Sequence, residues 1–233
     1  MSLIAQWLTA RFGPHAAMVV ELAPRAIAAA VDRQIDAHEA SGLRTRHAYG
    51  GAWPAQYEEL VRLLRGRDGV EVFHPHGSAV QMVLVNGYLL VPYRYAEDLA
   101  TSLTDPRNQP NKTCLELLSQ FGEPAPDLQP TLSDSLFPRP ETESRPLEDA
   151  APDGVVFVVF AANEQAGLLR AGLAEGSLQS DSTVRWPHIE WLPLPAGAAH
   201  PVPAGRPEGP ARFDDAPLPQ PRLDPRTANA ADA

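Results

Sequence analysis

The chain has 233 residues and a net charge of -10, with 29 Asp and Glu against 19 Lys and Arg, 25 prolines and one cysteine. A hydrophobic content of 44% is enough to bury a core, which excludes a chain that is disordered throughout. One cysteine excludes an internal disulfide and a thiolate zinc cluster, and no run of 18 apolar residues is present to span a membrane.

The N-terminal region is predicted to be helical. Apolar residues at helical spacing predict a short first helix from Leu3 to Phe12, which Gly13-Pro14 ends. A second helical stretch covers about 15–22. The first residues lack the basic head and long apolar run of a secretory signal, so we expect a soluble, cytoplasmic protein.

Proline marks the expected start of the next two helices. Pro24 suits a first helical turn, so we predict a separate third helix from this residue to the stop at Ser41-Gly42. Trp53-Pro54 opens a fourth helix. The apolar face of this fourth helix contains Trp53, Tyr57, Leu60, Val61 and Leu64. On the same helix, Glu58 and Arg62 are expected to form an i,i+4 ion pair.

Residues 70–73, 79–85 and 88–95 carry the clearest β-strand signal of the chain. Asn86-Gly87 separates the second and third of these stretches and is a preferred pair for a two-residue type I′ turn. Pro92 removes a backbone donor, so we expect the third strand to lie at a sheet edge or to be bulged there.

One further helix and two further strands follow. Residues 113–121 are predicted to be helical, and residues 155–160 form an unbroken apolar run. Such a run is typical of a strand that is buried on both faces at the centre of a sheet. Residues 186–192 suit a final strand. Residues 164–178 have no predicted element, because three glycines disfavour a helix there.

Proline and acidic residues are concentrated in two stretches without hydrophobic periodicity. Residues 122–152 contain seven prolines and have a net charge of -5, and residues 195–233 contain nine prolines. Such sequences bury too little apolar surface to offset the entropy of ordering, so the first is predicted to be a disordered linker and the second a disordered tail. The folded part is then a single α+β domain, 1–121 plus 153–194, in which N-terminal helices pack on a small mixed β-sheet.

The expected order of helix, strand, strand, strand, helix and strand over about residues 56–161 resembles the core of the restriction-endonuclease-like superfamily, the PD-(D/E)XK nucleases. The resemblance implies a magnesium site with an acidic residue on the second strand and an acid-x-lysine on the third. Here the second strand has no acid and ends at Asn86, and the third reads Pro92-Tyr93-Arg94 instead. The resemblance therefore implies a degenerate module that keeps a binding role without catalytic residues or a cofactor.

Two histidines near the end of the first strand are the best candidates for a metal site. His74 and His76 flank Pro75 and supply two imidazoles of the kind that bind metals. Glu71 is the nearest matched third ligand. A solvated turn is the alternative interpretation of these residues.

Basic and aromatic residues at two places are candidates for contacts with nucleic acid. Arg44 and Arg46 precede a tyrosine and two glycines, in a flexible stretch that can contact phosphate. On the third strand, Tyr93 can offer a stacking surface beside the cation of Arg94. The alternatives are a solvated basic loop and a strand that covers its core with one face.

Three functions from different classes are consistent with these patterns. The first is a non-enzymatic binding protein, a degenerate nuclease-like module that acts with nucleic acid or a nucleoprotein complex. The second is an interaction or regulatory protein that docks a protein partner through its Pro-rich arms. The third is an enzyme with a site near Glu71, His74 and His76. None of the three involves a membrane.

Overall fold

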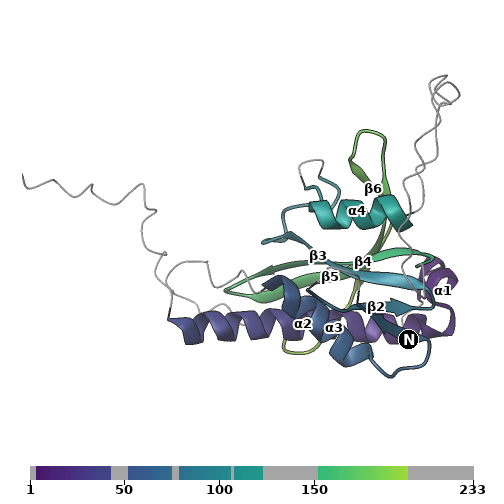
Figure 1. The fold of residues 1–233 in the computed structure, drawn as a ribbon. Coiled ribbons are helices and arrows are strands. Elements are labelled where there is room, and N and C mark those ends of the chain that lie inside the picture. Colours follow the sequence, from purple (N-terminus) through teal and green to yellow (C-terminus); the bar gives the residue numbers. More distant parts are fainter. Residues whose placement is uncertain (1–3, 43–51, 75–78, 106–107, 123–151, 199–233) are drawn as a thin grey trace, which may run out of the picture. The chain divides into compact units, whose positions relative to one another are not determined.

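Figure 1 shows the structure of the chain, which is a computed structural model. It describes residues 4–42, 52–74, 79–105, 108–122 and 152–198. The two Pro-rich stretches, 122–152 and 195–233, lie almost entirely outside these ranges, as do Arg44, Arg46 and His76.

Three helices come first along the chain, and the strands follow, with a fourth helix between the third and fourth strands. The helices are α1 (Gln6–Phe12), α2 (Ala16–Ser41), α3 (Ala52–Leu64) and α4 (Lys112–Phe121), with the 3₁₀ turn η1 (Gly13–His15) between the first two. The strands are β1 (Val70–Phe73), β2 (Met82–Val85), β3 (Tyr88–Ala96), β4 (Gly154–Asn163), β5 (Gly167–Leu178) and β6 (Val184–Leu192). The predicted α+β class is confirmed.

The strands form one mixed sheet in the order β1-β2-β3-β4-β5-β6. The pair β3 and β4 is parallel, from Tyr88↔Gly154 onward, and the other neighbouring pairs are antiparallel. Parallel neighbours need a crossover connection, and α4 lies in the connection between these two strands. Because β3 pairs with β4, a single sheet joins the segments before and after the Pro-rich stretch 122–152.

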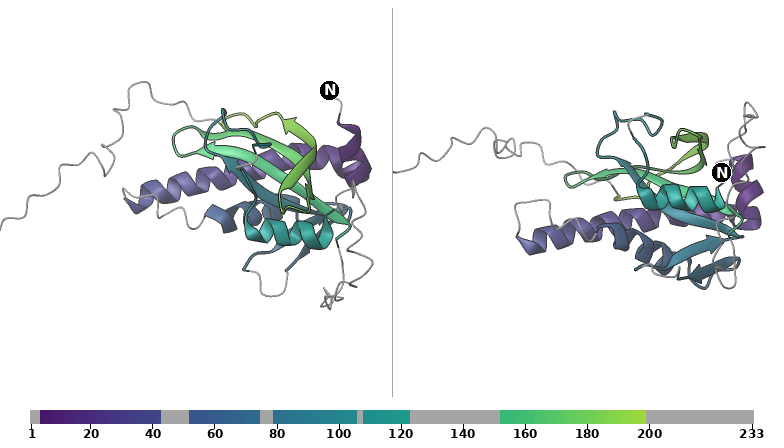
Figure 2. Two further views of the ribbon diagram at one scale, coloured as in Figure 1. Left: turned by 90° about the horizontal axis from the view of Figure 1, so that it is seen from above. Right: turned by 45° about the horizontal axis from the view of Figure 1, so that its top comes forward.

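Helices cover both faces of the sheet (Figure 1 and Figure 2). The face against α2 and α3 is called the α2 face below, and the opposite one the α4 face. Side chains of β4 alternate between the two: Val156, Val158 and Phe160 belong to the core on the α2 face, and Val155, Phe157 and Val159 to the core on the α4 face. Burial on both sides explains the unbroken apolar run, and the predicted central position of this strand is confirmed.

A single helix of 26 residues, α2, contains Pro24 in its interior, so the predicted break before this residue is wrong. An interior proline removes one helix hydrogen bond and costs about 3 kcal/mol. A continuous apolar stripe runs through both halves of the helix. Its buried side chains include Val19, Leu22, Ala23, Ala26, Ile27, Ala30 and Val31. Burial of this stripe against the sheet outweighs the local cost. Gly42, with φ of 64°, ends the helix as predicted.

The hairpin between β2 and β3 has the predicted turn. Asn86 and Gly87 have φ of 49° and 82°, and a type I′ turn requires positive φ at both positions. The sequence predicts that Pro92 lies at a sheet edge or in a bulge. The edge position is wrong for β3 as a whole, because this strand lies between β2 and β4, and the register irregularity of β3 falls between Arg94 and Ala96. Pro92 nevertheless lies two residues beyond Leu90, the last residue of β3 in register with β2, so only β4 pairs with β3 at the proline.

Two glycines of β5 make room for tryptophans of β6. A Cβ atom on Gly172 would lie 2.7 Å from Cε3 of Trp191, and one on Gly176 would lie 3.3 Å from Cζ3 of Trp186. These glycines therefore allow close packing of side chains from the next strand. Local sequence patterns do not reveal this, which is why residues 164–178 have no predicted element.

The end of the described chain returns to β5. The amide of Ala198 donates to the carbonyl of Pro195 at 3.1 Å, and the amide of Leu168 donates to the carbonyl of Ala198 at 3.2 Å. Ala198 is buried in the core of the α2 face. The first four residues of the predicted tail thus belong to the folded part. Among the described residues, no helix is long and apolar enough to cross a membrane.

Candidate functional site

Tyr93 and Arg94 are neighbours in β3 and lie on opposite faces of the sheet. Tyr93 lies on the α4 face, is 7% exposed and stacks on Trp186 with ring centroids 6.0 Å apart. Its hydroxyl donates to Oδ1 of Asn108 at 2.9 Å. Burial raises the pKa of Tyr93 to about 12. The ring fills the core, so the expected stacking surface of Tyr93 beside Arg94 is not formed.

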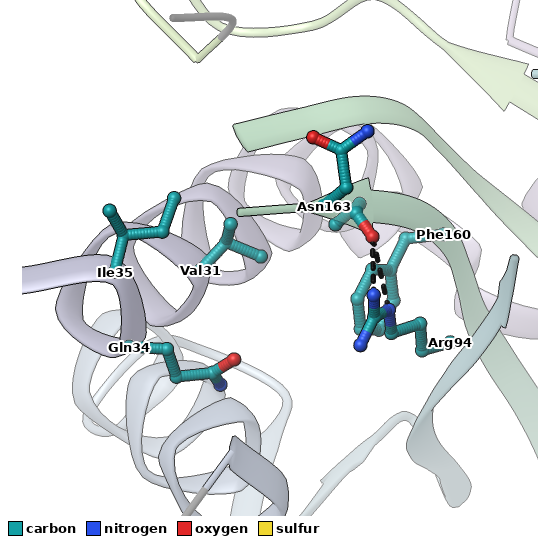
Figure 3. Close-up of a pocket in the computed structure, with 7 residues that line it drawn as sticks. Val31, Gln34, Ile35, Arg94, Phe160 and Asn163 are labelled. Atoms are coloured by element: carbon teal, nitrogen blue, oxygen red, sulfur yellow. Dashed lines mark hydrogen bonds between the residues drawn. The ribbon is translucent and has the colours of Figure 1, made fainter. Parts of the chain in front are cut away.

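Arg94 borders a small hollow of about 10 Å³ between α2 and β4 (Figure 3). Nε and Nη2 of this arginine donate to the carbonyl of Ala162 at 3.1 and 2.6 Å, and Nη2 lies 3.3 Å from Oε1 of Glu97. Asn163 accepts two backbone amides of the turn after β4. The other lining residues are Val31, Gln34, Ile35 and Phe160. A volume of this size holds at most about one water molecule. The hollow is therefore too small for a ligand, and Arg94 and Asn163 serve the chain itself.

The candidate metal ligands belong to the edge strand β1. Glu71 lies in β1, and His74 is the first residue after this strand. Both side chains are exposed. Neither residue lines the hollow beside Arg94. Across the described ranges, no group of three or more His, Cys, Asp or Glu side chains is placed to hold a metal ion. His76 lies outside these ranges, so the metal site stays a prediction, as does the contact of Arg44 and Arg46 with phosphate.

A buried ion pair anchors α1 to β5. Glu175 is 6% exposed, and its Oε1 accepts from Nε of Arg11 at 2.9 Å and lies 2.7 Å from Nη2. The Arg11 guanidinium also lies 5.4 Å from the centre of the Tyr88 ring. His188 lies 3.9 Å from Oε2 of Glu175 and stacks on Trp7, with ring centroids 5.6 Å apart. The carboxylate has its partners within the chain, so we assign this cluster to the anchoring of α1.

A second buried carboxylate links α2 to α3. Glu59 accepts from Arg33 at 2.9 Å and from Arg62 at 2.6 Å. Glu58 accepts from Arg33 at 3.0 Å, in place of the predicted pair with Arg62. Burial raises the pKa of Glu59, but the hydrogen bonds and charges of the two arginines outweigh burial and hold this pKa below its ordinary value.

The single cysteine of the chain lies in the closed part of the α4 face. Cys114 is 2% exposed, and its amide donates to Oδ1 of Asn111, which caps α4. Burial raises the pKa of the Cys114 thiol to about 12. The thiol is therefore neutral near pH 7, and it does not have the thiolate form that nucleophilic attack or metal binding requires.

An open aromatic site lies on the α4 face at the edge strand β6. Trp191 is 41% exposed. The Trp191 ring lies over Gly172, which is the register partner of Trp191 in β5. The centroid of this ring is 5.9 Å from the centroid of the Tyr95 ring and 5.1 Å from Cζ of Arg170. We call the group of Tyr95, Arg170, Gly172 and Trp191 the Trp191 surface. Three strands supply its residues, so a rigid sheet fixes its geometry.

Tyr95 packs beside the exposed ring and interacts with Arg170. Tyr95 is 5% exposed. Burial raises the pKa of Tyr95, whereas the charge of Arg170 and its hydrogen bond with this side chain act in the opposite direction. Arg170 therefore connects Tyr95 with the exposed ring of Trp191.

These features make the Trp191 surface the candidate site. No protein-family model, curated protein or solved structure matches the chain. Sequence reasoning missed Arg170 because no element is predicted over 164–178, and it placed Trp191 in the predicted final strand without a functional role. The alternation of side chains along 186–192 was the available signal, but it does not show which face of the final strand is left uncovered.

Proposed function

We propose that the chain is a non-enzymatic binding protein and that the Trp191 surface is where a protein partner docks. The observation that carries this proposal is the 41% exposure of Trp191 on the face of a rigid sheet. Tryptophan, tyrosine and arginine are the residue types that dominate binding energy at protein interfaces. All three types meet within about 6 Å at this surface, as ring and cation distances of 5.9 and 5.1 Å.

The charge of the folded part favours a protein over a nucleic acid as the partner. The described residues contain 10 Lys and Arg against 17 Asp and Glu, a net charge of -7. Binding to nucleic acid relies on cations that neutralise phosphates. The Trp191 surface has one cation, Arg170, and Arg94 is engaged with a backbone carbonyl on the opposite face.

A degenerate nuclease-like module is the second candidate, and one observation favours it. The element order α3-β1-β2-β3-α4-β4 is the order on which the resemblance to the PD-(D/E)XK nucleases rests. Mobility shift of single- and double-stranded DNA and RNA at low salt tests this candidate, because phosphate contacts are strongest there. Binding at micromolar protein would favour it over a protein partner, and we expect none.

Affinity capture from extracts of the source cells tests the proposed function, with Trp191→Ala compared to the unaltered chain. Trp53→Ala is the matched control, since Trp53 is 36% exposed and lies on α3. Proteins captured by the unaltered chain should remain with Trp53→Ala and be lost with Trp191→Ala. Circular dichroism and thermal melting establish that both variants are folded. Equal capture by Trp191→Ala and the unaltered chain would contradict the proposal.

A further inference from the structure

We propose that the partner is a basic protein segment with an apolar or aromatic anchor side chain, which docks on the Trp191 surface across the face of the sheet. This inference rests on the proposed function and adds the chemistry and direction of binding. Three observations carry it: the fixed position of Trp191, the charge around it, and the protected edge of β6.

Trp191 is held ready for contact before a partner arrives. Its ring lies against Gly172, where a Cβ atom would be 2.7 Å from Cε3, and the Arg170 guanidinium lies 5.1 Å from the ring centre. Contacts on two sides limit the rotamers of the indole. A preorganised aromatic side chain loses little entropy on binding, which makes it an effective anchor for an apolar group of the partner.

The charge around the Trp191 surface is negative. Asp98 follows β3, and its charge acts on Tyr95 of this surface. Asp98 is fully exposed, and its carboxylate accepts the amides of Ala100 and Thr101. Together with the net charge of -7 over the described residues, this carboxylate complements Lys and Arg that flank an apolar anchor, and it disfavours an acidic partner.

The edge of β6 is protected against strand addition. Pro187 lies within the strand and has no amide to donate, and Pro193 follows its last residue. The charged side chains of Arg185 and Glu190 also belong to this edge strand. A partner that adds a strand would meet a gap in the hydrogen-bond ladder at Pro187, whereas the face at Trp191 is open. Docking therefore uses the face.

Fluorescence polarisation with labelled synthetic dodecapeptides tests the inference on the full chain. One set has a single Leu, Phe, Trp or Pro between Lys and Arg residues, a second has Glu in place of Lys and Arg, and a third has Ser in place of the anchor. The first set should bind, and the second and third at least about tenfold more weakly. Affinity for the first set should fall as salt rises from about 50 to about 300 mM.

Variants locate the binding. Trp191→Ala should weaken the first set about 30-fold, the effect of a hot-spot residue, while Trp53→Ala stays within about twofold. Trp191→Phe keeps an aromatic ring and should weaken binding less than Trp191→Ala. It keeps the test valid if Trp191→Ala fails to fold.

Several outcomes would overturn the inference. These are no binding of the first set, equal binding of the Glu set, or competition by a DNA or RNA oligonucleotide for the same surface. A homodimer that Trp191→Ala converts to monomers in sedimentation would show that a second copy covers the surface. If capture from extracts depends on Trp191 but the basic peptides do not bind, the proposed function stands and this inference fails. If capture does not depend on Trp191, the proposed function itself fails.

Discussion

The two faces of the sheet are closed in different ways. The α2 face is covered by a helix of 26 residues together with α1 and α3, and buried carboxylates at Glu59 and Glu175 pair with arginines across it. The α4 face is covered by a helix of 10 residues, and its core is rich in aromatic rings. At the β6 end of this second face, Trp191 remains 41% exposed.

This difference separates stability from function. On the α2 face, aliphatic burial and internal ion pairs hold the helices to the sheet. On the α4 face, the same sheet carries an exposed indole with a cation over its ring. We therefore expect substitutions on the α2 face to change unfolding free energy, and substitutions at the Trp191 surface to change binding.

The largest loss of unfolding free energy is expected from Phe160→Ala. Phe160 lies in β4 on the α2 face and is 1% exposed, so its truncation leaves a cavity and should cost about 3–5 kcal/mol of unfolding free energy. Trp191→Ala should cost less than about 1 kcal/mol, because much of its ring is already in water. Urea unfolding of both variants measures this. A loss for Trp191→Ala as large as that for Phe160→Ala would show that the two faces do not differ in this way.

Removal of the charge at Glu175 should cause the next largest loss of unfolding free energy. Glu175→Gln leaves the Arg11 guanidinium, which is 24% exposed, without its carboxylate and should cost about 2 kcal/mol. Glu190→Gln, in the neighbouring strand, is the control and should stay within about 0.5 kcal/mol. Chemical denaturation compares the two, and equal losses would contradict the anchoring role of the Arg11–Glu175 pair.

Gly172→Ala should lower the stability of the fold and also weaken binding at the Trp191 surface. The new Cβ would lie 2.8 Å from the carbonyl oxygen of Glu190 and 2.7 Å from Cε3 of Trp191, so β6 or the indole must move. We expect a loss of about 1–2 kcal/mol and weaker binding of the basic peptides, because the anchor is displaced. Thermal melting and polarisation measure the two effects. Unchanged binding in a folded variant would contradict the role of Gly172 in holding Trp191.

A smaller loss of unfolding free energy is expected from Glu59→Gln, and the size of this loss depends on pH. The folded-state pKa of Glu59 lies below its ordinary value of 4.5, so the stability it contributes is complete above about pH 4.5 and is lost as pH falls through the lowered pKa. The variant should lose about 1 kcal/mol at pH 7, since Arg33 and Arg62 are partly in water. The difference should shrink at acid pH. A difference that is constant from pH 7 to pH 3 would contradict the assignment.

The reactivity of the Cys114 thiol tests whether α4 closes its part of the α4 face, and it does so without a substitution. Because burial raises its pKa to about 12, the thiol should react with a disulfide reagent at neutral pH at least about 100-fold more slowly in the folded chain than in urea. Absorbance of the released thiolate follows the reaction. Equal rates in the two states would show that α4 does not close its part of this face.

Local patterns were sufficient to predict much of the fold. The turn at Asn86-Gly87 requires positive φ at both residues, and the run 155–160 requires burial on both faces, so short-range chemistry determines each. Pro24 and Gly172 show where such reasoning fails. Packing on the sheet keeps Pro24 inside a helix, and Gly172 lies under a tryptophan from the next strand. Both effects come from residues distant in sequence.

The candidate site was less predictable than the fold. Alternation along β3 already implies that Tyr93 and Arg94 point to opposite faces, but it does not show that Tyr93 is buried under Trp186. The Trp191 surface combines residues from β3, β5 and β6, and its exposure depends on how far α4 extends over the sheet. Exposure of this kind is a property of the assembled layers, so no single stretch of sequence encodes it.

The most direct test of the central claim is the indole N–H spectrum of the ¹⁵N-tryptophan-labelled full chain during titration with a binding peptide of the first set. The spectrum of Trp191→Phe assigns the resonance of Trp191 among the four tryptophans. We predict that this resonance shifts or broadens on binding while those of Trp7 and Trp53 stay unchanged. Binding that leaves the Trp191 resonance in place, or that moves the resonance of Trp53 instead, would contradict the account.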